Sequence, residues 1–279
     1  MQAIWSSLSA LNASNEWMSR IGNNIANQST PGYASQTGSF ADTLTSAVSG
    51  NATAPSVASR YTPQGWNGGT GVMATSTGNN FSQMSLKQTG NPTDLAIQGS
   101  AFFQVAGHNG QTEYTKAGNF IWSRQPSGRY ALSTTDGKPV LDTQGQAILQ
   151  PAAPGSTMNV SSDGQVTFTT GNGQTVGGPK IALVHIANPG QSLSSAGNNT
   201  YTASAGASPR LVNGQALGNG ANGQLAAGQS RIKQGSLAMS NVNLTTAMVN
   251  MLQAQHMFDL NSKAVGFSSQ MMQIAATIR

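Results

Sequence analysis

Carboxylate and imidazole side chains carry most acid–base and metal chemistry, and this chain of 279 residues has few of either. Among its eight acidic residues, Asp136 and Asp142 could in principle form a carboxylate pair of the kind that hydrolyses glycans. Their spacing gives no specific support for such a pair. Asp136 also directly precedes a glycine, and the Asp-Gly dipeptide is typical of a tight turn. We therefore predict no active site here.

Metal and cofactor sites have no positive sign in the sequence. The three histidines, His108, His185 and His256, are far apart, and none lies in an H-x-x-x-H or H-E-x-x-H context. Cysteine is absent, which removes thiolate and disulfide chemistry. We expect no metal, no cofactor and no enzymatic activity.

One formal nucleotide-binding pattern does occur. Residues 218–223 read G-N-G-A-N-G and match G-x-G-x-x-G, but no buried strand precedes them and no acidic residue follows at the ribose-binding distance. A flexible loop rich in asparagine and glycine explains the pattern better. There is also no G-x-S-x-G nucleophile elbow.

The charge balance argues against nucleic acid as a partner. Charged residues make up 8% of the chain, and the net charge of +5 comes from 13 basic and 8 acidic residues that are spread thinly. Nucleic-acid-binding proteins instead gather lysine and arginine on one face. A surface with so few charges fits either a low-complexity coat or a face buried in a large assembly, where unpaired charges are costly.

Sequence signals for membrane insertion are also missing. The first basic residue is Arg20, no apolar core of a secretory signal precedes it, and no window approaches the roughly 18 apolar residues of a membrane span. We expect no direct membrane insertion. If the protein leaves the cytoplasm, we expect it to use a route without a cleaved signal peptide.

Both ends of the chain have the apolar periodicity of helices. Residues 1–28 carry apolar side chains at intervals of seven, with two more in the adjacent turns, and residues 29–32 then end the helix with proline and glycine. These positions are Ile4, Leu11, Met18 and Ile25, with Leu8 and Ile21 beside them. The pattern predicts an amphipathic helix.

A second helix is predicted over residues 236–279. One apolar series recurs every seven residues, at Leu237, Leu244, Met251, Phe258, Val265 and Met272. Another steps by three and four, at Leu260, Ala264, Phe267, Met271, Ile274 and Ile278. Two series make an apolar face wider than a simple two-stranded seam. Such a helix either packs on the core of its own domain, as most amphipathic helices do, or has a further partner.

The middle of the chain is predicted to be β-rich. Asn-Gly or Asp-Gly pairs, which favour tight hairpin turns, occur at positions 67, 109, 136, 163, 172, 213 and 219. Residues 101–105, 165–169 and 180–186 fit as strands between them. Residues 34–84, rich in serine, threonine, glycine and asparagine, predict loops and irregular extended structure.

At residues 23–33 the sequence resembles the N-terminal signature of flagellar rod and hook proteins, N-N-(I/L)-A-N-x-x-T-x-G-(Y/F), with every fixed position present. Residues 89–99, 102–105, 114–120, 136–141, 162–166 and 187–190 resemble further blocks of that family in the same order. The C-terminal blocks at 234–237, 240–243, 248–251 and 261–263, with Gln255, resemble it most closely. Departures are mild: Ala34, Thr93, His256, Phe258 and Asp259 differ from the usual residues.

The resemblance implies an axial structural protein that is exported by the flagellar type III apparatus and polymerises with its own copies and with other rod and hook proteins. It implies an irregular β domain with hairpins, flanked by N- and C-terminal α-helices that form a coiled-coil core on assembly. The corresponding segments are 1–33, 34–84, 85–233 and 234–279. The expected location is the flagellar basal body. The chain length favours a rod subunit over a hook subunit, which is generally longer, and among rod subunits the distal type is preferred to the proximal one.

Two sets of residues are expected to carry this function. The assembly interface comprises Ile4, Leu8, Leu11, Met18, Ile21, Ile25, Leu237, Leu244, Met248, Met251, Phe258, Leu260, Val265, Phe267, Met271 and Ile274. The signature turn comprises Asn24, Asn27, Thr30, Pro31, Gly32 and Tyr33. Two alternatives stay open: a secreted β-rich adhesin or phage-tail component, and a glycan-active enzyme that uses Asp136 and Asp142.

Overall fold

The computed structural model describes residues 2–42, 72–107, 110–125, 128–151, 156–212 and 230–277. The chain divides into two compact units. The helical unit comprises Met1–Ala26, Gln36–Gly78 and Asn243–Arg279, and the β unit comprises Asn27–Ser35 and Asn79–Val242. The middle of the chain is thus mainly β and both ends are helical, as the sequence predicts.

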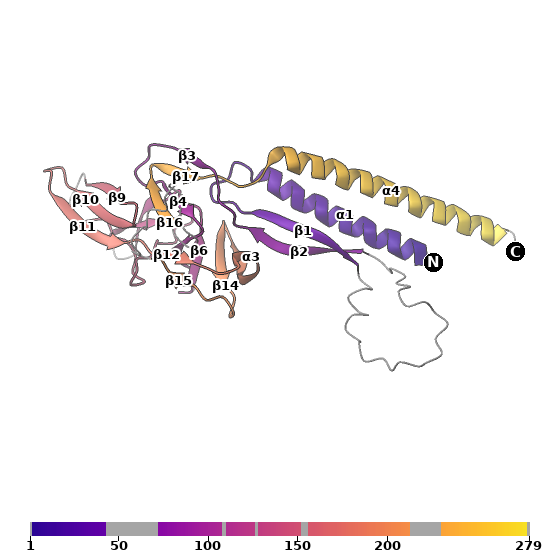
Figure 1. The fold of residues 1–279 in the computed structure, drawn as a ribbon, viewed down its shortest axis with the longest axis horizontal. Coiled ribbons are helices and arrows are strands. Elements are labelled where there is room, and N and C mark those ends of the chain that lie inside the picture. Colours follow the sequence, from indigo (N-terminus) through magenta and orange to yellow (C-terminus); the bar gives the residue numbers. More distant parts are fainter. Residues whose placement is uncertain are drawn as a thin grey trace, which may run out of the picture. The chain divides into compact units, whose positions relative to one another are not determined.

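The helical unit is built on two long helices, α1 (Gln2–Ala26) and α4 (Leu244–Thr277), which pack along each other. They run antiparallel, so the start of α1 and the end of α4 lie at the same end of this unit (Figure 1). At a rise of 1.5 Å per residue, α1 is about 37 Å long and α4 about 51 Å. The longer helix therefore has more surface than its partner can cover.

A two-stranded ribbon of β1 (Ser35–Asp42) and β2 (Val72–Asn80) belongs largely to the same unit. The Trp17 ring of α1 meets the Phe40 ring of β1 edge to face at 5.1 Å, and the Val72 amide donates to Ser9 Oγ at 3.1 Å. The described parts of residues 34–84 are thus regular strands rather than irregular structure. Residues 43–71, with the Asn67-Gly68 pair, lie outside the described residues.

Helix α4 begins later than the sequence predicts. Residues 236–279 were expected to be helical, but Ser236–Ala238 forms strand β17, which pairs with β3 (Leu86–Gln88). The helix starts after Asn243, whose Oδ1 accepts from the Thr246 amide at 3.1 Å and caps the first turn. Leu237 therefore fits the seven-residue series of α4 by position only, since it lies on a strand.

The β unit contains one six-stranded sheet and several smaller ones. The large sheet has the order β13-β14-β6-β5-β12-β15, and β11-β10-β9, β16-β4, β17-β3 and β7-β8 form the others. Their bounds are β4 (Leu95–Gly99), β5 (Phe102–Ala106), β6 (Thr112–Thr115), β7 (Ile121–Arg124), β8 (Tyr130–Ser133), β9 (Thr157–Val160), β10 (Gln165–Thr169), β11 (Thr175–Lys180), β12 (Leu183–His185), β13 (Leu193–Gly197), β14 (Thr200–Ala203), β15 (Arg210–Leu211) and β16 (Ser230–Gln234). One short helix, α3 (Pro189–Ser192), precedes β13.

Two apolar clusters form the core of the β unit because neighbouring residues of a strand point to opposite faces of a sheet. On β5, Phe103 belongs to a cluster with Leu95, Phe120 and Ile181, whereas Phe102 belongs to a second cluster with Phe81, Tyr114 and Tyr201. The large sheet is therefore buried on both faces. All members of both clusters are residues of the β unit.

The turn predictions are confirmed where the structure describes them. Gly137, Gly164 and Gly173 have φ angles of 82°, 90° and 78°, the left-handed conformation that a tight Asp-Gly or Asn-Gly turn requires. The predicted strand at 165–169 is β10, and that at 101–105 is β5 shifted by one residue. Asn109 and the pairs at 213 and 219, with the G-x-G-x-x-G pattern and His108, lie outside the described residues.

The predicted strand at 180–186 is divided between two sheets. Lys180 ends β11, and β12 begins at Leu183. Between them the Ile181 amide donates to the Gly164 carbonyl at 2.9 Å, and the Ala182 amide donates to the Leu141 carbonyl at 3.0 Å. The chain passes from one sheet to another at this point, so the apolar run at 180–186 pairs with strands of two different sheets.

Candidate assembly surface

The face of α4 that packs against α1 follows a strict three-and-four spacing, which we call the seam. Its members are Leu244, Ala247, Met251, Ala254, Phe258, Asn261, Val265 and Ser268, and all of them except Phe258, which is 37% exposed, are buried or partly covered. Ala247 and Ala254 are the buried members, so small side chains let the two helices approach closely. Four predicted interface residues, Leu244, Met251, Phe258 and Val265, belong to the seam.

The predicted series on α1 lies on the covered side of that helix. Ile21 is buried, and Leu11, Met18 and Ile25 are partly covered. Leu8, by contrast, is exposed. Ile4 lies in α1, but its side chain is outside the described residues.

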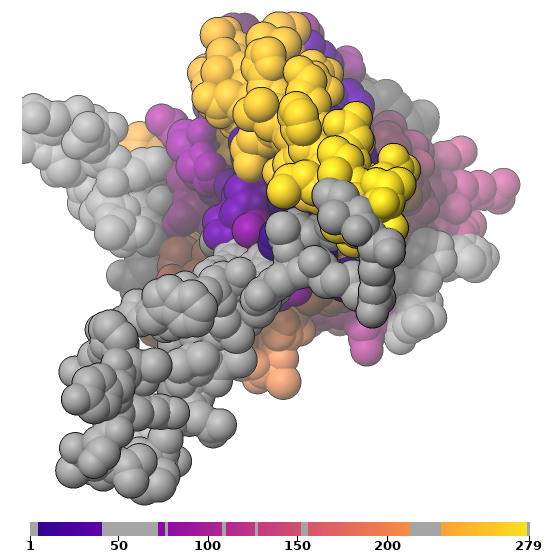
Figure 2. Space-filling model, turned by 90° about the vertical axis from the view of Figure 1, so that its right-hand side faces the viewer, coloured from indigo at the N-terminus to yellow at the C-terminus, as the bar shows by residue number. Residues whose placement is uncertain are grey.

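A second apolar face of α4, which we call the open stripe, is uncovered. It repeats every three or four residues and comprises Met257, Leu260, Ala264, Phe267, Met271 and Ile274. Leu260, Phe267 and Met271 are 65%, 67% and 71% exposed. Figure 2 shows much of the surface of α4, orange to yellow, open on the face that it presents. Six apolar positions in regular helical spacing form a strip that another helix can cover.

The remaining predicted residues of α4 extend the exposed apolar surface. Met248 is 51% exposed and lies outside both the seam and the open stripe, beside the exposed Val249 and Leu252. Met272, which continues the seven-residue series of the seam, is also largely exposed. The apolar surface of α4 is therefore broad, as the two overlapping series in the sequence predict.

The signature turn has hydrogen bonds both within itself and to other parts of the β unit. Within the turn, the Thr30 amide donates to the Asn27 carbonyl at 3.1 Å. Outward, the Gly32 amide donates to the Ala238 carbonyl at 2.8 Å, and Asn199 Nδ2 donates to the Pro31 carbonyl at 3.1 Å. The turn is thus held against both β17 and the tip of the β13–β14 hairpin.

Gly32 has a steric reason to be glycine. Its φ is 70°, and a Cβ placed there would collide with the backbone of Ala117. The next residue, Tyr33, is buried, and burial raises the pKa of its phenol. Burial likewise raises the pKa of Tyr201 to about 12, with the neighbouring Tyr33 adding to the rise.

Asn24 lies in the helical unit, near the end of α1, and its side chain binds the backbone of β1. Its Nδ2 donates to the Gln36 carbonyl and its Oδ1 accepts from the Gln36 amide, both at 2.9 Å. One side-chain amide therefore pairs with the backbone as a neighbouring strand would. This contact brings the end of α1 next to the start of β1 within the same unit.

Two functional positions were not predicted individually from the sequence. Asn241 accepts from the Ser35 amide at 2.9 Å and donates to the Asn80 carbonyl at 2.7 Å and to Ser82 Oγ at 3.1 Å. It therefore ties together three segments that are far apart in the chain. Asn199 likewise ties the signature turn to other segments. The sequence signals for these two residues are only a matching family block for Asn241 and a hairpin position for Asn199.

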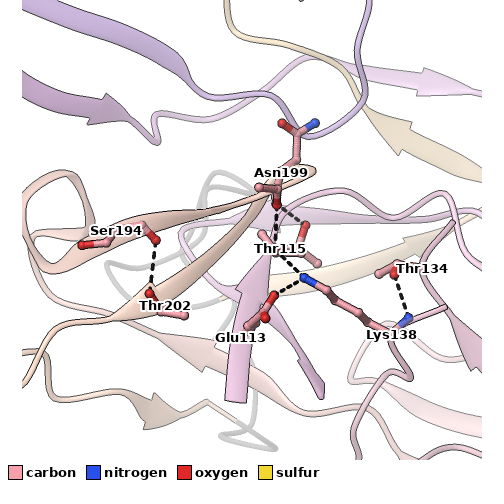
Figure 3. Close-up of polar contacts among 9 residues, drawn as sticks. Glu113, Thr115, Thr134, Lys138, Ser194, Asn199 and Thr202 are labelled. Carbon is pink, nitrogen blue, oxygen red and sulfur yellow. Dashed lines mark hydrogen bonds and ion pairs between the residues drawn. The ribbon is translucent and has the colours of Figure 1, made fainter. Parts of the chain in front are cut away.

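A buried ionic network supports the hairpin that holds the signature turn. Lys138 Nζ pairs with the Glu113 carboxylate and donates to Thr200 Oγ1 at 3.0 Å, while Thr115 Oγ1 donates to the Asn199 carbonyl at 2.8 Å (Figure 3). Removing one partner of such a pair leaves an uncompensated buried charge. The network thus couples the position of Asn199 to the centre of the large sheet.

Asp136 and Asp142, which the alternative of a glycan-active enzyme would use as a carboxylate pair, both lie at turns. Asp142 Oδ1 accepts from the amides of Gln144 and Gln146, both at 2.8 Å, so this carboxylate holds a turn. Asp136 is exposed and precedes the left-handed Gly137. Within the described residues, no three histidine or acidic side chains gather as metal ligands, and no helix is long and apolar enough to span a membrane.

A β unit inserted between two terminal helices is the architecture that the resemblance to axial flagellar proteins predicts. Comparison with known proteins agrees with this class. Residues 96–168 match the model of the flagellar hook protein FlgE/F/G D1 domain, and residues 233–278 match that of the flagellar basal body rod FlgEFG protein C-terminal region.

Full-length relatives narrow the class further. The flagellar basal-body rod protein FlgG of Buchnera aphidicola is 32% identical over 278 residues, covering 97% of each chain. Its namesake in Bacillus subtilis is 31% identical, covering 98% of this chain and 97% of the relative, and that of Borreliella burgdorferi is 30% identical over 282 residues, covering 100% and 99%. This chain belongs to the family of FlgG flagellar basal-body rod proteins.

Proposed function

We propose that this protein is a structural subunit of the bacterial flagellar basal-body rod, in the distal part, and that it polymerises through its terminal helices to transmit torque. The main support for this assembly mechanism is the exposure of the open stripe on α4. Large apolar side chains from Met257 to Ile274 are exposed in one helical strip, although the neighbouring face of the same helix is already packed. Covering that strip releases water from apolar surface and favours association.

The geometry supports contacts between copies through the helices. The seam binds α4 to α1 within one chain, and the open stripe stays free for the helices of neighbouring chains. A contact between two different surfaces of identical subunits builds an open helical polymer when the rotation between neighbouring subunits does not close a ring. The other axial proteins of the flagellum are the natural partners at the two ends of such a segment, and the type III export apparatus is the expected route outward.

The charge pattern is consistent with this role. Charged residues make up 8% of the chain, and few of them lie on α4. Subunits packed side by side would bury a large fraction of their surface, where unpaired charges are costly. A structural role rather than a catalytic one also agrees with the names of the relatives, which are those of rod proteins.

The signature turn has a separate part in this proposal. It follows α1 in the chain, and its hydrogen bonds hold it to β17 and to the β13–β14 hairpin within the β unit. In the assembled rod, the turn would direct the chain from the helical core to the β unit outside. An adhesin or phage-tail component would not need this combination of a fixed corner and two apolar terminal helices.

The experiment compares polymerisation of the full-length protein with that of two matched double variants. Leu260→Asp with Phe267→Asp places two charges on the open stripe, and Ser262→Asp with Ser269→Asp places two charges at the same spacing on another exposed side of α4. We expect sedimentation and electron microscopy to show filaments for the parent and the control but not for the stripe variant. Equal polymerisation of all three proteins would overturn the proposal.

A further inference from the structure

The β unit contains a polar hollow of about 430 Å³ that the assembly mechanism does not use. Four separate segments enclose it: the signature turn, the chain after β6, the turn after β8 and the tip of the β13–β14 hairpin. The lining residues are Asn27, Thr30, Pro31, Tyr33, Thr115, Ala117, Asn119, Thr134, Thr135, Asp136, Ser195, Asn198 and Asn199. All of them belong to the β unit.

Five polar side chains of this hollow have no hydrogen-bond partner within the described chain. They are Asn119, Thr135, Asp136, Ser195 and Asn198, and they come from three of the four segments. Hydroxyl and amide groups both donate and accept, and the carboxylate accepts only. Their convergence offers a ligand several hydrogen bonds of both kinds.

The tip of the β13–β14 hairpin forms one wall of the hollow. Asn198 and Asn199 both have left-handed backbone conformations, with φ of 48° and 57°. Asn199 is fixed there by the Pro31 carbonyl, whereas Asn198 is exposed beside the hollow with its amide free. They form the two-residue loop between Gly197 and Thr200, a tight hairpin turn that favours asparagine in this conformation.

The chemistry of the lining limits the class of ligand. It includes one carboxylate and no lysine, arginine or histidine, so an anion such as a phosphate or an acidic sugar is disfavoured. Pro31 and Ala117 contribute apolar surface between the polar groups. We propose that this hollow binds an uncharged saccharide, whose hydroxyls pair with the amide, hydroxyl and carboxylate groups while its ring packs on Pro31 and Ala117.

Two substitutions remove single binding groups while preserving the backbone. Asn198→Gly deletes the side chain at a left-handed position that glycine adopts without strain. Asp136→Asn removes the charge but keeps a residue that favours the same turn before Gly137. Asn188→Gly and Asp163→Asn are matched controls, because Asn188 also has a φ of 48° and Asp163 also precedes a left-handed glycine, and neither lines the hollow.

The test is saturation-transfer NMR on the full-length protein with a trimer of N-acetylglucosamine and, in a parallel arm, maltotriose. We expect saturable binding of at least one trimer, weakened about three- to tenfold in each hollow variant and unchanged in both controls. Tighter binding of the N-acetylglucosamine trimer than of maltotriose would show that the hollow recognises the acetamido group. The proposal fails if neither saccharide saturates, or if the hollow variants bind as well as the parent.

Discussion

The Gly32 amide donates to the Ala238 carbonyl at 2.8 Å, and this bond joins the turn that follows α1 to the strand that precedes α4. The two residues are 206 positions apart by their numbers, yet they lie in one compact unit. The β unit therefore begins and ends at the same corner. We expect substitutions at that corner to destabilise the protein more than substitutions on its surface.

The first prediction concerns Gly32→Ala. The added methyl group meets the Ala117 backbone at a left-handed φ, so we expect the free energy of unfolding to fall by about 3 kcal/mol or more. The control is Gly137→Ala, which has a φ of 82° but open space around its Cβ. That variant should lose only about 1–2 kcal/mol. Equal losses in urea denaturation would show that contact with Ala117 is unimportant.

The second prediction concerns Asn241, which ties residue 35 to residues 80 and 82. Asn241→Ala removes all three hydrogen bonds, and we expect it to destabilise the β unit by about 2 kcal/mol. Asn241→Asp keeps the acceptor for the Ser35 amide but sets a carboxylate oxygen against the Asn80 carbonyl oxygen, so its loss should be at least as large when urea denaturation is followed by circular dichroism. If both variants were as stable as the parent, the bonds would contribute nothing.

The third prediction is a dependence of stability on pH that comes from Lys116. This lysine is buried, donates to the Phe81 carbonyl at 3.0 Å and lies over the Phe102 ring, and desolvation lowers its pKa to about 8. The unfolded chain keeps a lysine pKa of about 10.4, so between these pH values it binds more protons than the folded chain. Stability should therefore rise from pH 8 towards pH 10, by at most about 1.4 kcal/mol per pH unit.

Above about pH 10 the trend should reverse, because tyrosines deprotonate in the unfolded chain at about that pH. Burial raises the folded-state pKa of Tyr33, Tyr114 and Tyr201, so the folded chain then binds more protons. Urea denaturation at a series of pH values tests this. Lys116→Met should abolish the rise, whereas the exposed Lys87→Met should retain it; a rise that persists in Lys116→Met would assign it to another group.

The fourth prediction separates the two faces of α4. Ala254 is fully buried in the seam, so Ala254→Leu should force α1 and α4 apart and cost about 1–3 kcal/mol. Ala264 is exposed on the same helix, and Ala264→Leu should leave the stability of the monomer nearly unchanged. Thermal unfolding followed by circular dichroism compares the two. A similar loss in both variants would mean that the seam is not tightly packed.

The periodicity of the sequence identified the helices because it records burial on one side of a helix. It could not distinguish Leu237 from Leu244, since both fit the same seven-residue series. What separates them is non-local: Ser236–Ala238 pairs with Leu86–Gln88, and Asn243 caps the helix. A strand of three residues leaves too short a pattern to compete with a long helical one.

The turns were predictable, and the partners of the polar side chains were not. Asp-Gly and Asn-Gly pairs act locally, so Gly137, Gly164 and Gly173 have the expected conformation. Asn241, Asn199 and Lys116 act through groups that lie between 35 and 206 positions away, as their numbers show. No local pattern specifies such contacts. The division of residues 34–84 between two units depends on the same long-range pairing.

The central claim is that other copies cover the open stripe of α4 on assembly, and the absence of cysteine from the chain allows a direct measurement. Phe267→Cys and the control Ser262→Cys each place a single thiol on an exposed position of α4. The rate of maleimide labelling is measured for both variants before and after polymerisation. We predict that polymerisation slows labelling at position 267 at least tenfold more than at position 262; equal rates at position 267 in monomer and polymer would contradict the account.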